Sequence, residues 1–446
     1  MMTTPICDFL TRYANNDFLR LHMPGHKGRG CFGVERYDLT EVSGADSLYD
    51  ADGIIRESEK NASRLFGCHT FYSTEGSSLC IRAMLFLILQ YAKMQRKKPL
   101  ILAGRNAHKV FLGGAALLDL DVEWLYGAGE SYLSCDVTAE HLEQVLSSML
   151  DKPAAVYLTA PDYLGNGLDW RALADCCHRH GVLLLADCAH GAYLKFLTPS
   201  RYPIDLGVDL CCSSAHKTLS ALTGSAYLHI SYSAPSWMAD QAKNALAAFG
   251  STSPSYLILR SLDALNVELA GEYSVRLDSF VRQVSMLRQE LERQGYSFFG
   301  DEPLKLTVST KPYGYHGFDF AHLLREKRVE CEFSDRDWVV LMLTPALGEE
   351  GLLRLLTALL EIPPRAPISE FAPRPTVLSR VMSLREAMLS PMECIPTSSA
   401  LGRILASPSV ACPPAVPIAI CGERLDAAAL DAFAYYGVDQ IWVVKK

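Results

Sequence analysis

The chain has 446 residues, of which 49% are hydrophobic and 21% are charged, and its net charge is −8. This length allows about two or three domains with a sizeable core, and the composition is ordinary for a soluble globular protein. The negative charge argues against nucleic acid or an anionic membrane as the main partner.

The cysteines and the apolar segments bear on the compartment. The N-terminal stretch 1–5 lacks a basic segment followed by an apolar run, so no signal peptide is expected. The 14 cysteines include no C-x-x-C pair, which favours buried thiols in a reducing cytosol over disulfides. The most apolar helix, expected over 83–89, is far too short for a membrane span.

The first polar cluster of the chain lies at 21–28. Pro24 and Gly25 place it in a loop. His22 and His26 have the spacing of metal ligands on a helix, but proline and glycine between them argue against a helix, so no metal site is predicted. Histidine and lysine side chains in such a loop belong either to a solvated surface or to a site.

A second cluster, Gly76-Ser77-Ser78, lies between a strand or turn that begins near residue 70 and an apolar helix over 79–94. A helix N-terminus carries unpaired N–H groups and a positive dipole end, so it can bind phosphate. Alternatively, Ser77 or Ser78 is simply the N-cap of the helix.

Between residues 70 and 230 short apolar strands alternate with helices. The further strands are expected over 99–103, 122–126, 154–158, 182–186, 208–212 and 226–230. This alternation predicts an α/β fold with a mostly parallel central sheet and helices on both faces. Ligands of such sheets bind beyond the carboxyl ends of the strands. Polar clusters stand at four of these positions, 76–78, 105–108, 187–190 and 214–217, and we therefore predict a single site.

Lys217 is the centre of the last cluster. A lysine at the end of a buried strand loses hydration, and its free amine becomes available for a Schiff base; a surface lysine is the alternative. An aldehyde cofactor with a phosphate and a pyridine ring would use all four clusters. The lysine would bind the aldehyde, the Gly-Ser-Ser helix start the phosphate and Asp187 the pyridinium nitrogen, while His108 could stack on the ring. This is the chemistry of pyridoxal 5'-phosphate (PLP).

The C-terminal half predicts a smaller α+β domain after a long helical region that ends near residue 294. Its strands are expected over 304–308 and 338–342, with a helix over 318–327 between them. The stretch 363–375 holds five prolines and is expected to be a connector. The predicted division is an N-terminal arm (1–45), a large PLP-binding domain (46–295), a small α+β domain (296–362), the Pro-rich connector (363–375) and a C-terminal subdomain (376–446).

Taken together, the motifs resemble those of the ornithine/lysine/arginine decarboxylase family, which are fold-type I, aspartate aminotransferase-like PLP enzymes. The matching stretches are collinear and run nearly end to end. They are 21–28 (LHMPGHKG), 38–46 (DLTEVSGAD), 76–78 (GSS), 105–109 (RNAHK), 187–191 (DCAHG), 214–222 (SAHKTLSAL), 252–263 (TSPSYLILRSLD), 332–335 (EFSD) and 413–423 (PPAVPIAICGE). The chain is similar to the short form of the family, without a receiver-like domain before the first motif.

The resemblance implies a role for each matching residue around the cofactor. Lys217 would be the Schiff-base lysine, Asp187 would hold the pyridine nitrogen and His108 would stack on the ring. The residues implied near the phosphate or the ring hydroxyl are Ser77, Ser78, Ser214, His216 and His190. Because family sites form at a dimer interface, Thr252 and Ser253 would approach the cofactor from the partner subunit.

The resemblance also implies the reaction, which is decarboxylation of lysine, arginine or ornithine to CO2 and a diamine or polyamine by a cytosolic homodimer or dimer-based assembly. Glu332 and Asp335 would lie near the distal cation of the substrate, because a buried cation needs a counter-charge; a solvated acidic loop is the alternative. Four residues depart from the usual family pattern, namely Cys188, Val110, Asp162 and Ala415. The sequence does not choose among the three substrates.

Two other functions stay open from the residues alone. A PLP enzyme of the same fold could be an aminotransferase or another lyase, and its products would then differ from CO2 and a diamine. A non-catalytic relative could bind PLP or a polyamine and regulate a partner, although the lysine, aspartate and histidine set argues against it.

Overall fold

The computed structural model describes residues 2–127, 131–411 and 415–446. The chain forms two compact units, each built from two stretches. The first unit comprises Met1–Lys97 and Trp170–Arg276, and the second comprises Lys98–Asp169 and Leu277–Lys446. The five-segment division stays a prediction, and Pro413 and Pro414 of the last motif lie outside the described residues.

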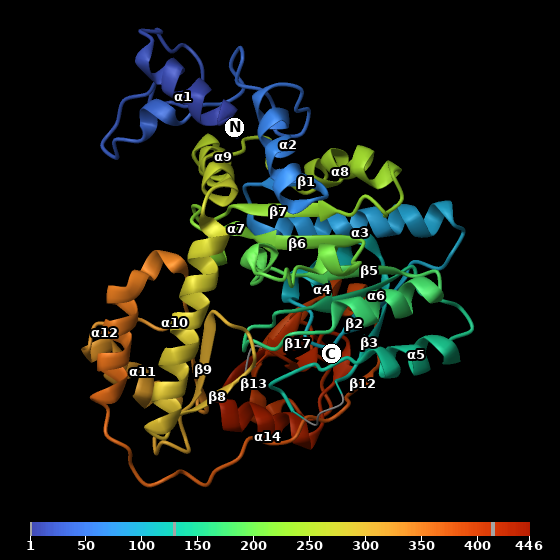
Figure 1. Ribbon diagram of the computed structural model, residues 1–446. Coiled ribbons are helices and arrows are strands. Elements are labelled where there is room, and N and C mark those ends of the chain that lie inside the picture. The colour runs from blue at the N-terminus through green and yellow to red at the C-terminus, as the bar shows by residue number, and fades with distance from the viewer. Residues whose placement is uncertain (1, 128–130, 412–414) are drawn as a thin grey trace. The chain divides into compact units, whose positions relative to one another are not determined.

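Four strands of the first unit form a sheet in the order β1-β7-β6-β5 (Figure 1). They are β1 (His69–Ser73), β5 (Leu183–Asp187), β6 (Leu210–Ser214) and β7 (Ala226–Ile230). Strands β5 and β6 run parallel, whereas β7 is antiparallel to both β6 and β1. All side chains of β5, β6 and β7 are buried, which explains why these strands appear in the sequence as apolar runs without alternation.

The helices of the first unit are α1 (Pro5–Asn15), α2 (Ile54–Phe66), α3 (Gly76–Met94), α6 (Trp170–Arg179), the short α7 (Ala215–Thr218), α8 (Trp237–Ala247) and α9 (Tyr256–Ala270). Among the described residues, α3 is the one helix long and apolar enough to cross a membrane. It contains the apolar run 83–89 and begins three residues before the helix predicted over 79–94. Ten of its side chains are buried in the protein, and it contacts β6 and β7. It is therefore a core helix.

The conformation of Asp46 explains why the motif 38–46 ends in an aspartate. Asp46 has a φ of +72°, which is uncommon for a residue with a side chain. Its carboxylate accepts hydrogen bonds at 2.9–3.1 Å from the backbone N–H groups of Ser47, Asp52, Gly53 and Ile55. The negative charge thereby satisfies unpaired donors at the start of α2 and lies at the positive end of its dipole.

In the second unit three parallel strands form the order β4-β2-β3. They are β2 (Leu100–Gly104), β3 (Asp121–Leu125) and β4 (Ala155–Thr159), and their connections contain α4 (Lys109–Leu118) and α5 (Ala139–Ser148). The parallel pairs in both units confirm the predicted α/β class. Each strand predicted between residues 99 and 230 lies within two residues of its observed bounds.

An antiparallel sheet with the order β10-β11-β9-β8 follows in the second unit. Its strands are β8 (Ser297–Phe299), β9 (Lys305–Ser309), β10 (Phe333–Ser334) and β11 (Trp338–Met342). The accompanying helices are α10 (Tyr273–Arg293), which begins in the first unit, α11 (Gly317–Glu326) and α12 (Gly348–Leu360). The predicted α+β pattern is therefore present.

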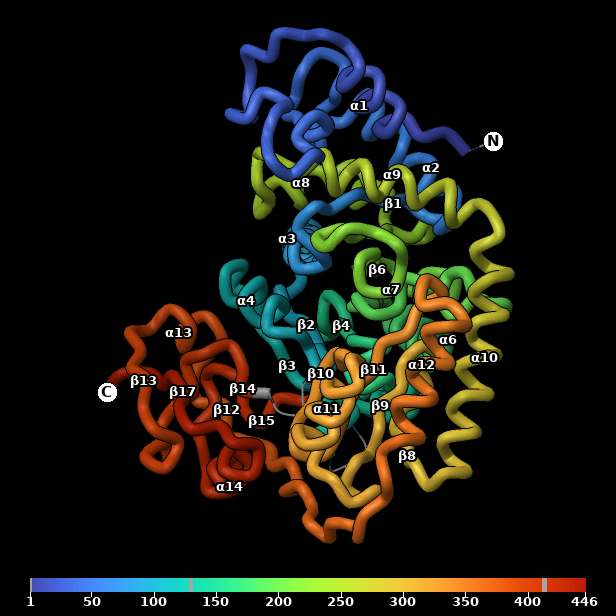
Figure 2. The backbone as a smooth tube through the Cα atoms, turned by 90° about the vertical axis from the view of Figure 1, so that its left-hand side faces the viewer, coloured from blue at the N-terminus to red at the C-terminus, as the bar shows by residue number. Residues whose placement is uncertain are grey.

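Within residues 376–411 and 415–446, the strands form three small antiparallel pairs. They are β12 (Ser379–Arg380) with β16 (Glu423–Arg424), β13 (Met392–Pro396) with β17 (Gln440–Val444) and β14 (Ser409–Ala411) with β15 (Pro417–Ile420), with helices α13 (Leu384–Leu389) and α14 (Ala427–Tyr436). Figure 2 shows β13 and β17 side by side in the segment coloured red.

Hydrogen bonds join the Pro-rich stretch 363–375 to residues that flank the strands of the antiparallel sheet β10-β11-β9-β8. The backbone N–H of Ile368 donates to Lys311 O at 3.0 Å, and Arg336 binds both carboxylate oxygens of Glu370 at 2.9 Å. The stretch therefore lies along its own unit instead of extending from it.

Candidate active site

The neighbouring strands β5 and β6 bring two of the predicted polar clusters together in the first unit. The strands are parallel and pair Asp187 with Cys212, so their carboxyl ends lie at the same edge. Backbone hydrogen bonds to β6 continue past the end of β5, with Cys188 N donating to Cys212 O at 2.9 Å and Ser214 N donating to Ala189 O at 3.3 Å. The side chains that follow each strand consequently lie next to one another.

Lys217 reaches the cluster that follows β5. It lies on the short helix α7, and its Nζ is 3.1 Å from Nε2 of His190. The lysine is partly buried and the histidine is buried. An amine and an imidazole at this distance can exchange a proton, which suits a nucleophilic lysine.

Asp187 is the last residue of β5, and it is only 2% exposed. Its Oδ1 accepts a hydrogen bond from the backbone N–H of Ala189 at 3.2 Å and another from Sγ of Cys212 at 3.5 Å. Burying an ionised carboxylate costs free energy unless hydrogen bonds or a cation compensate for it. A protonated ring nitrogen of a cofactor would be such a cation.

The start of α3 has the properties of a phosphate site. The N-cap residue is Glu75, which makes no side-chain cap bond, so neither Ser77 nor Ser78 is the N-cap and that alternative is wrong. Gly76 has a φ of +70°, which favours glycine. A Cβ built on Gly76 would lie 3.9 Å from Cε1 of His216, so this helix start is close to the segment that carries Lys217.

Ser214 and His216 complete the polar groups near this helix start. Ser214 is 1% exposed, and its hydroxyl has no hydrogen-bond partner among the described residues. A buried hydroxyl without a partner costs free energy, so an acceptor such as a phosphate oxygen would stabilise it. Nδ1 of His216 lies 2.8 Å from Ser225 O and therefore carries a proton, because a carbonyl oxygen only accepts.

Thr252 and Ser253 are exposed residues close to the same helix start. The preceding Ser251 donates its backbone N–H to Oε1 of Glu75 at 2.7 Å. Their approach to the cofactor of a partner subunit stays a prediction.

His108 belongs to the second unit, where it follows β2 and is the N-cap of α4. Its Nδ1 accepts a hydrogen bond from the backbone N–H of Val110 at 3.3 Å. Because this bond uses the backbone of Val110, the departure from the family pattern at this position leaves it intact.

Glu332 and Asp335, also in the second unit, have different surroundings. Glu332 is exposed, and its Oε1 accepts a hydrogen bond from the hydroxyl of Tyr163 at 2.7 Å. Asp335 is buried, and its Oδ1 accepts the backbone N–H groups of Asp337 and Trp338, each at 2.8 Å. Burial raises the pKa of Asp335 to about 6. Its Oδ2 has no hydrogen-bond partner within the described part of the chain. A solvated acidic loop therefore describes Glu332 but not Asp335.

Comparison with known proteins decides the family. A family described as "Orn/Lys/Arg decarboxylase, major domain" matches residues 4–353. The chain belongs to this family. It is a decarboxylase of basic amino acids, and the family depends on PLP.

The relatives of this decarboxylase agree in length. The chain is 28% identical to an arginine decarboxylase of Halalkalibacterium halodurans, with 94% of this chain and 90% of the relative covered. It is also 28% identical to an arginine decarboxylase of Bacillus subtilis, with 94% of this chain and 91% of that relative covered. A lysine decarboxylase structure from Francisella novicida shares the fold with a TM-score of 0.80 at 16% identity, covering 100% of this chain and 81% of that one.

Sequence reasoning missed that two motif residues of this decarboxylase pair with each other. The two guanidinium nitrogens of Arg105 bind the two carboxylate oxygens of Glu423 at 2.6 and 2.8 Å. Both side chains are buried, with exposed fractions of 3% and 2%. Both residues stand in matching motifs, but a separation of 318 residues gave no signal of contact.

Asp162, another departure from the family pattern, has a structural role in the turn after β4. Its Oδ1 accepts the backbone N–H groups of Leu164 and Asn166, each at 3.0 Å, and its Oδ2 accepts from the side-chain amide of Asn166 at 2.7 Å. The carboxylate therefore closes its own turn. Cys188 and Ala415 are both buried, and the side chain of Cys188 interacts with the thiol of Cys211 on the neighbouring strand β6.

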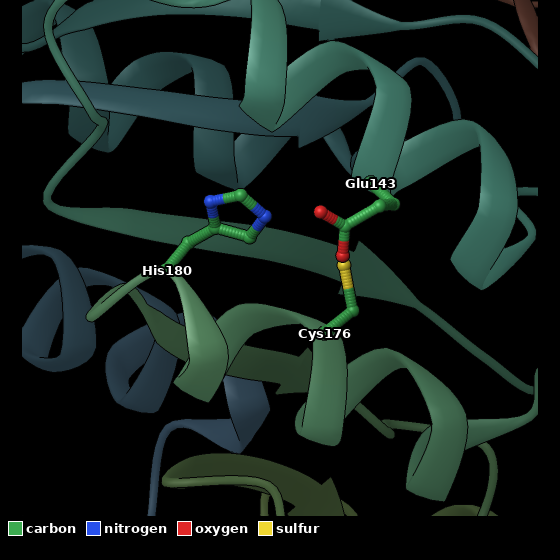
Figure 3. Close-up of side chains that lie close together, drawn as sticks. All are labelled: Glu143, Cys176 and His180. Atoms are coloured by element: carbon green, nitrogen blue, oxygen red, sulfur yellow. The ribbon is translucent and has the colours of Figure 1, made fainter.

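One further group of potential metal ligands gives no site. Figure 3 labels Cys176, His180 and Glu143. Cys176 lies on α6 in the first unit, and His180 follows the last residue of this helix. Glu143 lies on α5 in the second unit. Because the residues are divided between the units, we assign no metal site to them.

Proposed function

We propose that this decarboxylase binds PLP through Lys217 and releases CO2 from arginine. The observation that carries the proposal is the 3.1 Å distance from Lys217 Nζ to His190 Nε2 beside the buried Asp187. The names of the relatives, which are arginine decarboxylases matched along 94% of the chain, favour arginine over lysine and ornithine.

The residues of the first unit fit the cofactor group by group. Asp187 would balance the charge of the protonated ring nitrogen. The first turn of α3 and the hydroxyl of Ser214 would bind the phosphate dianion. When bound, PLP supplies an electron sink for the electron pair that CO2 leaves behind.

Lys217 and His190 would handle the proton. Replacing CO2 by hydrogen requires one proton at the α-carbon of the substrate. Lys217 Nζ, once released from the cofactor, can hold that proton, and His190 at 3.1 Å can supply it. The stacking of His108 on the ring stays a prediction.

Glu332 is our candidate partner for the substrate's guanidinium group, and Asp335 is the second. A guanidinium presents a planar fork of donors that a carboxylate can bind with both oxygens. The hydroxyl of Tyr163 holds one oxygen of Glu332 and so restricts the orientation of the carboxylate.

The proposed homodimer is supported by exposed apolar side chains on the N-terminal segment. Six large apolar side chains there are exposed, namely Phe18, Leu19, Leu21, Met23, Phe32 and Val34. A second copy of the chain would cover them, since exposed apolar clusters mark interaction sites. We place the enzyme in the cytosol, where the thiols of its cysteines, free among the described residues, would stay reduced.

The test is an absorbance spectrum with added PLP followed by a CO2 assay with arginine, lysine and ornithine. We expect an absorbance band at about 420 nm that is lost in Lys217→Ala. The control variant Lys60→Ala, which changes an exposed lysine of α2, should keep the band. CO2 from arginine alone supports the proposal. No Lys217-dependent band would overturn the role of Lys217, and release from lysine or ornithine instead would overturn the substrate.

A further inference from the structure

Cys212 lies directly against the aspartate that is proposed to hold the cofactor's ring nitrogen. It is the middle residue of β6 and is fully buried. Its Sγ lies 3.5 Å from Oδ1 of Asp187, the oxygen that also accepts the backbone N–H of Ala189 at 3.2 Å. Two donors therefore converge on one oxygen of this carboxylate.

The direction of this bond follows from the two groups. An ionised carboxylate only accepts hydrogen bonds, so the thiol is the donor. Burial and the neighbouring charge of Asp187 raise the pKa of Cys212 well above its ordinary value, so the thiol keeps its proton. The thiol of Cys212 is therefore the donor in this contact.

The neighbouring cysteine shows that the contact is specific to one position. Successive side chains of a strand point to opposite faces of the sheet. Cys211 is also fully buried, but its Sγ donates to the hydroxyl of Tyr202 at 3.7 Å and to the backbone oxygen of Cys212 at 3.6 Å. The Cys-Cys doublet therefore offers two thiols of equal burial with different hydrogen-bond partners, Tyr202 for Cys211 and Asp187 for Cys212.

We propose that Cys212 is a positioning residue for the reaction, whose S–H donates to Oδ1 of Asp187 and orients the carboxylate toward the ring nitrogen of PLP. This inference rests on the proposed function, because it needs a cofactor ring beside Asp187. A thiol is a weak donor. It fixes the carboxylate while withdrawing little of the charge that stabilises the protonated ring.

The experiment compares Cys212→Ala and Cys212→Val, which remove the donor, with Cys211→Ala as the matched control and Cys212→Ser, which keeps a donor. Apoenzyme of each variant is titrated with PLP, and the melting temperature, kcat and KM are measured. We expect the dissociation constant of PLP to rise about five- to tenfold in both donor-free variants, which is the loss of about one hydrogen bond. The serine variant and Cys211→Ala are expected to stay within about twofold of the wild type.

The outcomes separate positioning from packing. In Cys212→Ala we expect kcat to fall while KM stays nearly unchanged. In Cys211→Ala we expect a similar drop in melting temperature but no fall in kcat. Equal losses of PLP affinity in Cys211→Ala and Cys212→Ala would overturn the inference, as would unchanged PLP affinity in Cys212→Val. A wild type that binds no PLP overturns the proposed function itself, so the two failures are distinguishable.

Discussion

Asp187 of the first unit and Asp335 of the second are both only 2% exposed, yet their hydrogen bonds differ. Asp187 ends a parallel strand and accepts bonds from the next residues of its chain and from the adjacent strand. Asp335 accepts two backbone N–H groups of its own hairpin turn between β10 and β11. Burial of a carboxylate therefore does not by itself mark a site, and the groups around it decide its role.

Glu423 adds a third environment to this comparison. Its carboxylate is buried like the two aspartates, but both of its oxygens bind Arg105 and one also accepts the backbone N–H of Ile420 at 2.8 Å. The charge is fully compensated by a cation of the protein. Glu423 can thus stabilise the fold, whereas the pairing of Asp187 with a cofactor's ring nitrogen stays a proposal.

The largest effect is expected for Asp187→Asn. The amide cannot balance a positive ring nitrogen, so kcat should fall on the order of 10³-fold, as when one preorganised charge-stabilising group is removed. The melting temperature of the apoenzyme should change little because the side chain keeps its size. Steady-state CO2 release and a thermal melt measure both, and a kcat within tenfold of the wild type would contradict the role of Asp187.

The second effect concerns stability. Glu423→Gln leaves the Arg105 guanidinium buried without its counter-charge, which should cost about 3 kcal/mol of the free energy of unfolding. Replacing both residues by methionine should cost less than the single change, because no charge then stays buried. Urea unfolding of the single and double variants measures the difference, and equal losses would argue against a desolvated pair.

Asp335→Asn should act in the opposite direction on stability. The pKa of the folded state is raised from 3.8 to about 6, so the folded carboxyl resists ionisation more than the unfolded one. The stability that this group contributes is therefore full below about pH 4 and is lost as the pH rises through about 6. The total loss in the free energy of unfolding is up to ~3 kcal/mol. The amide keeps an acceptor for the turn and removes the charge.

The variant should accordingly be more stable than the wild type at pH 7 and equally stable at pH 4, measured by urea unfolding at both values. If Asp335 serves as a counter-charge for the substrate, KM for arginine should rise in the same variant. If the variant is more stable but its KM for arginine is unchanged, Asp335 has only a structural role in its turn.

The fold could be predicted further from the sequence than the site. Strands buried on both faces are continuous apolar runs, so the parallel sheet was visible in the residues, and parallel strands bring the 187–190 and 214–217 clusters to one edge. The contact of Cys212 with Asp187 depends on the register of two strands, which no local pattern encodes. Likewise, the turn-closing bonds of Asp162 and Asp335 require backbone conformations that an acidic residue in a loop does not reveal.

The smallest effect is expected for Tyr163→Phe. Burial and the hydrogen bond to Glu332 raise the pKa of Tyr163, so the hydroxyl stays protonated and donates at 2.7 Å. Removing this one bond should weaken the orientation of the exposed Glu332 and raise KM for arginine about three- to tenfold, with kcat nearly unchanged. Tyr232→Phe, at an exposed tyrosine of the first unit, is the control and should leave KM as it is. Because Glu332 is exposed, water already hydrates its charge. The hydroxyl of Tyr163 therefore orients the carboxylate and is not needed to compensate for burial of the charge. A fall in kcat without a change in KM would therefore indicate that Tyr163 acts elsewhere than on the substrate's distal cation.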